Sequence, residues 1–106
     1  MAMPDAVAAL LALLEAPAAS LTGAVYNVTA FNPSAGELAE LVRRAFPEAR
    51  ISFASDRRRQ AIVDSWPEDV DDGPARRDWG FRPAYDLKRT FEEYLVPNVT
   101  RRYASR

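Results

Sequence analysis

The sequence predicts a small α/β domain built on one strand–helix–strand unit with additional helices. Residues 23–29 form a run of β-branched and aromatic side chains, which predicts the first strand. Polarity alternates over residues 50–53, which predicts a second strand with one buried face. Because a helix is expected between them, the two strands are predicted to be parallel with a right-handed crossover.

The intervening helix is predicted over residues 34–46 by its start signal, its periodicity and its stop. Ser34 and Glu37 have the spacing of a capping box, and Pro47 ends the pattern. Four apolar residues recur at i, i+3, i+4 and i+7: Leu38, Leu41, Val42 and Ala45. This spacing is typical of an amphipathic helix that covers one face of a sheet.

Further elements are expected on both sides of this unit. Residues 56–60 are predicted to form a polar turn, and residues 61–63 a short edge strand. Asp72 is predicted to cap a short helix with Pro74 in its first turn and Gly80 just past its end. A final helix is expected between Asp86, its cap, and Pro97, with one apolar stripe: Leu87, Phe91, Tyr94 and Leu95.

The most unusual segment is residues 4–16, which predict a helix that is apolar on every face. Its only charges are Asp5 and Glu15, and small or aliphatic side chains fill the rest. Such a helix is normally buried on all sides, and a chain of 106 residues has little material to cover it. We therefore expect a partner for this helix, although an alanine-rich outer face without a partner is an alternative.

The composition is that of a soluble globular protein and excludes several kinds of chemistry. The chain has 14 basic and 15 acidic residues, a net charge of −1, and neither histidine nor cysteine. Disulfides, cysteine nucleophiles, histidine-assisted serine catalysis and the usual zinc sites are therefore excluded. The balanced charge disfavours nucleic-acid binding, and no apolar run is long enough to span a bilayer.

The ends of the chain are expected to lie outside the domain. Residues 1–2 resemble a start or cloning remnant, residues 3–96 are expected to fold, and residues 97–106 to form a basic, frayed tail. No basic segment precedes the first apolar stretch, so a signal peptide is not expected. We therefore expect a cytoplasmic location.

Residue chemistry bears on three kinds of ligand site in this chain. The four glycines are too far apart for a phosphate-cradling turn, so no cofactor-binding residue is expected on this chain. Residues 68–72 are acidic, but they lack the spacing of a calcium loop, and no metal site is expected. Arg59 and Trp66 are candidates for a ligand site, and Trp79 is expected in the core.

The segment from Arg59 to Pro67, followed by Asp71-Asp72 and by residues 75–81, resembles the C-terminal region of short-chain-type L-threonine 3-dehydrogenases. These enzymes belong to the extended short-chain dehydrogenase/reductase superfamily, together with NAD-dependent epimerases and dehydratases. The resemblance extends over residues 3–96. It implies the small substrate-binding portion of such an enzyme, with a substrate-facing segment that includes these residues: Arg59, Gln60, Asp64, Ser65 and Trp66.

The sequence also departs from this superfamily in ways that limit what is implied. The Gly-rich turn for NAD and the Tyr-x-x-x-Lys pair are absent: residue 84, four before Lys88, is Ala84. The resemblance therefore implies no catalytic residue on this chain and NAD only in the complete enzyme. The Arg-x-Gly-Asp run of nucleotide-sugar epimerases is also absent after Arg57, which favours a small hydroxy amino acid as substrate.

Three functional hypotheses follow. The first is an inactive substrate-binding fragment of an enzyme that converts L-threonine to 2-amino-3-ketobutyrate, partnered by a missing Rossmann domain or by another copy of the chain. The second is the corresponding fragment of a sugar-nucleotide epimerase or dehydratase. The third is a stand-alone interaction module that associates through the helix at 4–16.

Overall fold

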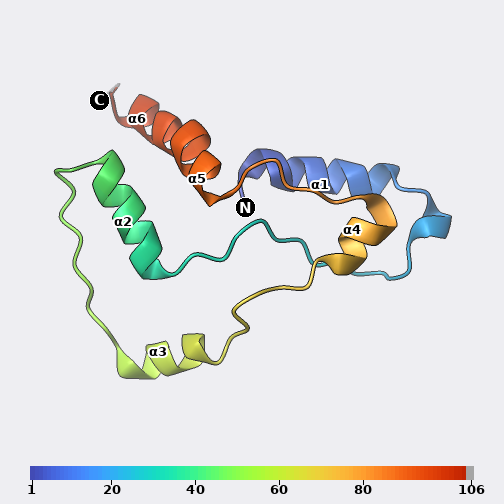
Figure 1. Ribbon diagram of the computed structural model, residues 1–106, viewed down its shortest axis with the longest axis horizontal. Helices are drawn as coiled ribbons and strands as arrows, with labels where there is room; N and C mark the ends of the chain where they lie inside the picture. Colours follow the sequence, from blue (N-terminus) through green and yellow to red (C-terminus); the bar gives the residue numbers. More distant parts are fainter. Residues whose placement is uncertain (105–106) are drawn as a thin grey trace. The chain divides into compact units, whose positions relative to one another are not determined.

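The computed structural model describes residues 1–104, which form two compact units. One unit joins residues 1–31 to the chain from Val70 onward, and the other comprises residues 32–69. The first unit begins with α1 (Met3–Glu15) and the 3₁₀ turn η1 (Ala18–Ser20), and it continues after residue 69 with α4 (Gly73–Trp79), α5 (Leu87–Arg89), the π-helix η2 (Thr90–Leu95) and α6 (Val96–Ala104) (Figure 1). The second unit holds α2 (Ala35–Ala45) and α3 (Arg57–Asp64). Within residues 1–104, no helix combines the length and the apolar character required to cross a bilayer.

The predicted strand–helix–strand unit is not confirmed, because the part of the chain that the structure describes contains no β-strand. Its helix is present as α2, with the capping box at Ser34 and Glu37. Residues 23–29 and 50–53 are non-helical, and neither forms a ladder with another described segment. A strand exists only through hydrogen bonds to a second strand, so apolar alternation alone does not produce one.

The segment predicted as a polar turn and an edge strand, residues 56–63, instead forms the N-cap, Asp56, and most of α3. The Oδ1 atom of Asp56 accepts hydrogen bonds from the backbone N–H groups of Arg58, at 2.9 Å, and Arg59, at 3.2 Å. These bonds satisfy amides that the first helical turn leaves without partners. The cap and the helix propensity of arginine outweigh the β-branched residues at the end of the segment.

The core of the first unit lies where α1 meets α4 and the segment that follows it. Ala9, Ala75 and Phe81 are buried there, and Tyr26 and Trp79 pack against them. The Trp79 ring centroid lies 5.9 Å from that of Tyr26, edge to face, and 5.6 Å from that of Phe81. The prediction that Trp79 belongs to the core is therefore confirmed.

Residues 1–2 are packed into the fold, contrary to the expectation that they lie outside it. Ala2 is buried and is the N-cap residue of α1, and Met1 packs against the core cluster. Asp5, also buried, accepts hydrogen bonds from the backbone N–H groups of Ala84, at 2.8 Å, and Tyr85, at 3.0 Å. The start of α1 is thereby fixed to the segment that precedes α5.

A single carboxylate oxygen connects α4 to the loop after η1. The Oδ2 atom of Asp78 accepts hydrogen bonds from the Thr22 N–H, at 2.9 Å, the Thr22 hydroxyl, at 2.6 Å, and the Tyr26 hydroxyl, at 2.6 Å. Hydrogen bonds from Thr22 and then from Tyr26 lower the pKa of Asp78 to about 2. The group is therefore ionised throughout the neutral and mildly acidic range.

Helix α4 has the predicted proline near its start and glycine at its end, but not the predicted cap. Gly80 adopts φ 74°, and the Phe81 N–H donates to the Ala75 carbonyl at 3.2 Å, which is a Schellman-type ending. The Asp72 side chain makes no capping bond and instead accepts two 2.7 Å hydrogen bonds from Arg76. These bonds lower the pKa of Asp72 and raise that of Arg76.

The final helix begins at Asp86 as predicted but does not end at Pro97. Asp86 accepts the Arg89 N–H at 2.8 Å, and the helix continues through η2 into α6, which reaches Ala104. In a regular helix the Pro97 ring would collide with the Glu93 carbonyl four residues earlier. The preceding π turn, in which the Val96 N–H donates to the Phe91 carbonyl, widens the helix at this point. The expectation of a frayed tail from residue 97 is therefore wrong through residue 104, and residues 105–106 lie outside the described residues.

Candidate functional site

Helix α3 and its C-terminal turn carry all five residues predicted to face substrate. Every residue from 57 to 66 is exposed, and the Arg59 side chain retains 87% of its accessible surface. Arg59 lies 3.8 Å from Asp56, measured from Nε to Oδ2, which is too long for a strong fixed ion pair. The segment therefore presents its side chains outward.

Helical geometry divides the five predicted residues into two groups. Arg59 shares a face of α3 with Ile62 and Val63, which lie three and four residues further along the helix. Trp66 follows just past the end of α3, where its backbone N–H donates to the Val63 carbonyl at 3.0 Å. All three apolar residues are exposed: Ile62 to 59%, Val63 to 51% and Trp66 to 65%. The stripe thus combines one guanidinium with three apolar side chains. We refer to these four residues as the α3 stripe.

The other predicted residues are already engaged within α3. The Gln60 amide donates to Asp64 Oδ1 at 2.5 Å, one turn along the helix. The Ser65 hydroxyl donates to the Ile62 carbonyl at 2.7 Å at the end of the helix. Contact with a ligand would require these three side chains to exchange hydrogen bonds that they already make, whereas Arg59 and Trp66 are available.

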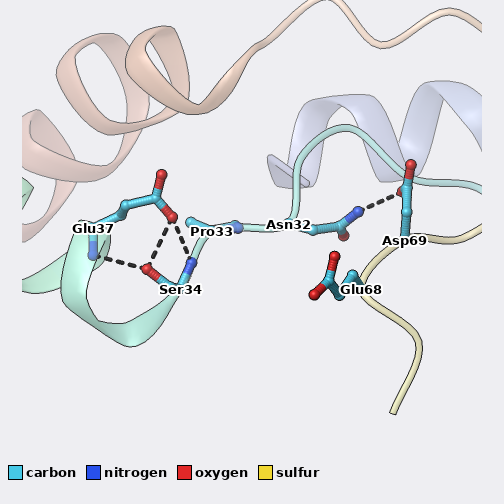
Figure 2. Close-up of a pocket in the computed structure, with 6 residues that line it drawn as sticks. All are labelled: Asn32, Pro33, Ser34, Glu37, Glu68 and Asp69. Atoms are coloured by element: carbon cyan, nitrogen blue, oxygen red, sulfur yellow. Dashed lines mark hydrogen bonds between the residues drawn. The ribbon is translucent and has the colours of Figure 1, made fainter. Parts of the chain in front are cut away.

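The second unit also contains a shallow polar pocket of about 560 Å³ that sequence reasoning did not identify. Figure 2 shows the residues that line it: Asn32, Pro33, Ser34, Glu37, Glu68 and Asp69. The Asn32 amide donates to Asp69 Oδ1 at 2.5 Å, and this bond joins the segment before α2 to the acidic loop after α3. The pocket is rich in acceptor oxygens, and it suits a cationic or polyhydroxylated ligand better than an anion.

Glu37 contributes a fixed negative charge to this pocket. Its Oε2 atom accepts the Ser34 N–H at 2.8 Å and the Ser34 hydroxyl at 2.9 Å (Figure 2). These hydrogen bonds, that of the backbone first, lower the pKa of Glu37. Among the described residues, no three acidic side chains converge to hold a metal ion.

Two sequence signals pointed toward this pocket without revealing it. The capping box at Ser34 and Glu37 was identified as a helix start, and residues 68–72 were considered only as a metal site. The missing information was the contact between Asn32 and Asp69, which are 37 positions apart in the chain. No local pattern encodes a pairing at that separation.

The glycines of this chain have local roles and do not form a cradle for a dinucleotide. Gly80 provides the left-handed residue at the end of α4. A Cβ at Gly73 would lie 2.9 Å from Asp71 Oδ1, so this glycine makes room for an Asp71 turn and not for a phosphate. Among the described residues, these two glycines therefore do not build the Gly-rich turn that holds a dinucleotide phosphate.

Comparisons with known proteins confirm the resemblance found in the sequence. The mitochondrial L-threonine 3-dehydrogenase of Sus scrofa is 45% identical over 87 residues, which are 82% of this chain and 23% of that protein. An uncharacterised epimerase/dehydratase of Staphylococcus haemolyticus is 36% identical over 82% of this chain and 28% of its own length. No protein-family model matches the chain.

The fold agrees as well. The solved structure of L-threonine 3-dehydrogenase from Trypanosoma brucei matches this chain over 98% of its length and over 32% of that chain, with a TM-score of 0.83 and 32% identity. This chain therefore has the fold of one part of an extended short-chain dehydrogenase/reductase. More particularly, it is a relative of the L-threonine 3-dehydrogenases and the NAD-dependent epimerases/dehydratases, and it spans about a quarter to a third of the proteins it matches.

Proposed function

We propose that this chain is the C-terminal substrate-binding portion of a cytoplasmic, NAD-dependent dehydrogenase that acts on L-threonine. The observation that carries the proposal is 45% identity to an L-threonine 3-dehydrogenase over 82% of the chain. The complete enzyme would oxidise the 3-hydroxyl group of L-threonine and form 2-amino-3-ketobutyrate. NAD and the groups that transfer the proton would belong to a nucleotide-binding portion outside this chain, because the residues present here do not fit them.

The α3 stripe is the part of the chain that we assign to the substrate cleft. A guanidinium such as that of Arg59 matches the geometry of an amino-acid carboxylate. Trp66, with Ile62 and Val63, offers apolar surface that would exclude water from the reacting carbon. Exposure of the whole stripe supports this assignment, since four side chains of this kind along α3 and the turn that follows it indicate a surface that another body covers.

A sugar-nucleotide epimerase or dehydratase is the alternative, supported by the 36% identity to the staphylococcal epimerase/dehydratase. Two features of this chain disfavour it. Arg57 is not followed by the glycine and aspartate of the epimerase run. The polar pocket next to α2 is lined by carboxylates, which would repel a nucleotide diphosphate.

The experiment is reconstitution of activity from two polypeptides. The chain alone should give no threonine-dependent reduction of NAD. Mixed with the separately produced nucleotide-binding portion of the pig enzyme, it should restore formation of NADH when L-threonine is added. Restoration by a UDP-sugar substrate and not by threonine would support the epimerase alternative, and turnover by this chain alone would refute the proposal.

Trp66 and Arg59 can then be tested in the reconstituted enzyme. Trp66→Ala and Arg59→Met should raise the KM for threonine while leaving that for NAD unchanged. Arg58→Met is the matched control, because it removes an equivalent exposed charge from a different face of α3. If the two arginine substitutions raise the KM for threonine equally, only the positive charge of α3 matters for substrate binding, and Arg59 does not line the cleft.

A further inference from the structure

We propose that Asn32 and Asp69 are positioning residues for Trp66, the aromatic residue that the proposed function assigns to the substrate cleft. This inference rests on the proposed function, because it concerns how the chain holds a residue of that cleft. All three residues belong to the second unit, of which Asn32 and Asp69 are the first and last residues. The hydrogen bond from the Asn32 amide to Asp69 Oδ1, at 2.5 Å, therefore joins the two ends of this unit (Figure 2).

The segment that connects Trp66 to Asp69 is short and stiff. Only Pro67 and Glu68 lie between them. The ring of Pro67 fixes its own φ at about −65° and disfavours the helical region for the residue before it, which is Trp66. On the other side, the Trp66 N–H donates to the Val63 carbonyl at 3.0 Å, at the end of α3. Trp66 is therefore held between α3 and Asp69, and a movement of Asp69 is transmitted to it.

Asn32 is anchored in a similar way on its side of the bond. Pro33 follows it directly, and Ser34 is the N-cap residue of α2. The Ser34 N–H donates to Glu37 Oε2 at 2.8 Å, and the Glu37 N–H donates to the Ser34 hydroxyl at 3.2 Å. The bond between Asn32 and Asp69 therefore ties the segment that carries Trp66 to the N-terminus of α2, across 37 positions of the chain.

The charges around this bond favour an amide at position 32. The pocket beside it is lined by three carboxylates, those of Glu37, Glu68 and Asp69 (Figure 2). Among these acceptors, the Asn32 amide supplies an N–H donor, and a hydrogen bond to a charged acceptor is stronger than one between neutral groups.

An aspartate at position 32 is the sharpest perturbation, because it places a second carboxylate against that of Asp69 and the two repel. In the reconstituted enzyme, Asn32→Asp should raise the KM for threonine by about threefold or more and leave the KM for NAD unchanged. The reversed pair, Asn32→Asp with Asp69→Asn, again places a donor opposite an acceptor and should restore the KM of the parent. Asn27→Asp is the matched control, because it makes the same change at an exposed asparagine of the first unit, and it should leave both KM values unchanged.

A double-mutant comparison shows whether Asn32 acts through Trp66. Once Trp66→Ala has removed the positioned side chain, adding Asn32→Asp should raise the KM for threonine no further. Additive increases would overturn the inference. So would a KM that Trp66→Ala raises and Asn32→Asp leaves unchanged, a result that the proposed function would survive. If Trp66→Ala itself leaves the KM unchanged, the assignment of Trp66 to the cleft is wrong, and this inference is overturned with it.

Nuclear magnetic resonance of the chain alone tests the positioning without any activity. Relaxation of the backbone amides of residues 65, 66, 68 and 69 should show greater mobility on the picosecond-to-nanosecond timescale in Asn32→Asp than in the parent. The reversed pair should restore the parent values, and the amides within α2 and α3 should be unaffected in every variant. Equal mobility of residues 65–69 in Asn32→Asp and in the parent would overturn the inference. So would a loosening of α2 and α3 as a whole, because the bond would then stabilise the entire unit and not position Trp66.

Discussion

Replacement of Trp79 by alanine should remove about 3 kcal/mol from the free energy of unfolding. Removal of a buried tryptophan costs about 3–5 kcal/mol through lost burial and the cavity that remains. Trp79 is half-buried, so the lower end of this range applies. Its ring pairs with Tyr26 and with Phe81, each contributing about 0.5–1.5 kcal/mol, are part of the loss.

The chain provides its own control in Trp66, which is 65% exposed and follows α3. Trp66→Ala should change the free energy of unfolding by less than about 0.5 kcal/mol, as is usual for a surface position. Trp79→Phe should fall between the two alanine variants, because it retains an aromatic ring between Tyr26 and Phe81.

Urea denaturation followed by far-ultraviolet circular dichroism measures all three variants with one signal, independent of tryptophan fluorescence. A domain of this size has about 5–15 kcal/mol of stability in total, so a loss of 3 kcal/mol shifts the midpoint clearly. If Trp79→Ala and Trp66→Ala lower the midpoint equally, the described core of the first unit is wrong. Losses below about 1 kcal/mol for Trp79→Ala would lead to the same conclusion.

Three further outcomes are expected. Ser34→Ala should cost about 0.5–2 kcal/mol, because it removes the hydroxyl oxygen that accepts the Glu37 N–H and leaves only the backbone half of the capping box. Nuclear magnetic resonance should show fraying of the first turn of α2, and an unchanged first turn would contradict this. The pKa of Asp78 is lowered to about 2, so the stability that its carboxylate contributes should be complete above the unfolded pKa of 3.8 and should be lost as the pH falls toward 2. Asp78→Asn should therefore flatten the acid denaturation curve between these pH values. A curve that the substitution leaves unaltered would refute the role of the three hydrogen bonds to Asp78. Pro97→Ala should convert η2 to regular α-helix, as measured by carbon chemical shifts, and should raise the free energy of unfolding by up to about 3 kcal/mol, as measured by urea denaturation. A π turn that persists in this variant would show that Pro97 is not its cause.

The elements that sequence analysis predicted correctly are those whose signals lie within one or two helical turns. Ser34 and Glu37 interact over three residues, and both bonds of their capping box are present. Pro74 and Gly80 frame α4, where the glycine has the positive φ expected of a helix end. Pro97 has an equally local signal but was misinterpreted, because a helix can accommodate a proline by widening one turn.

The predicted strands depended on a backbone pairing that residues 1–104 do not make. In residues 25–28 the alternation is present in three dimensions: Val25 is 85% exposed, whereas Tyr26 and Val28 pack against the core. The side-chain pattern is therefore that of a strand, but the backbone forms no ladder within the described residues, and the ladder is what defines the element. Sequence patterns predict which side chains face the core and do not predict whether a second strand is present.

The candidate site shows the same limit at the level of single residues. The resemblance selected Arg59, Gln60, Asp64, Ser65 and Trp66 as one contiguous segment. Because the segment is helical and not extended, its residues divide by a period of 3.6 and not by alternation. Gln60 and Asp64 then bond to each other, while Arg59 and Trp66 remain exposed. The secondary structure of this segment therefore decides which of the five side chains can meet a ligand, and it makes Arg59 and Trp66 the residues whose substitution is most informative.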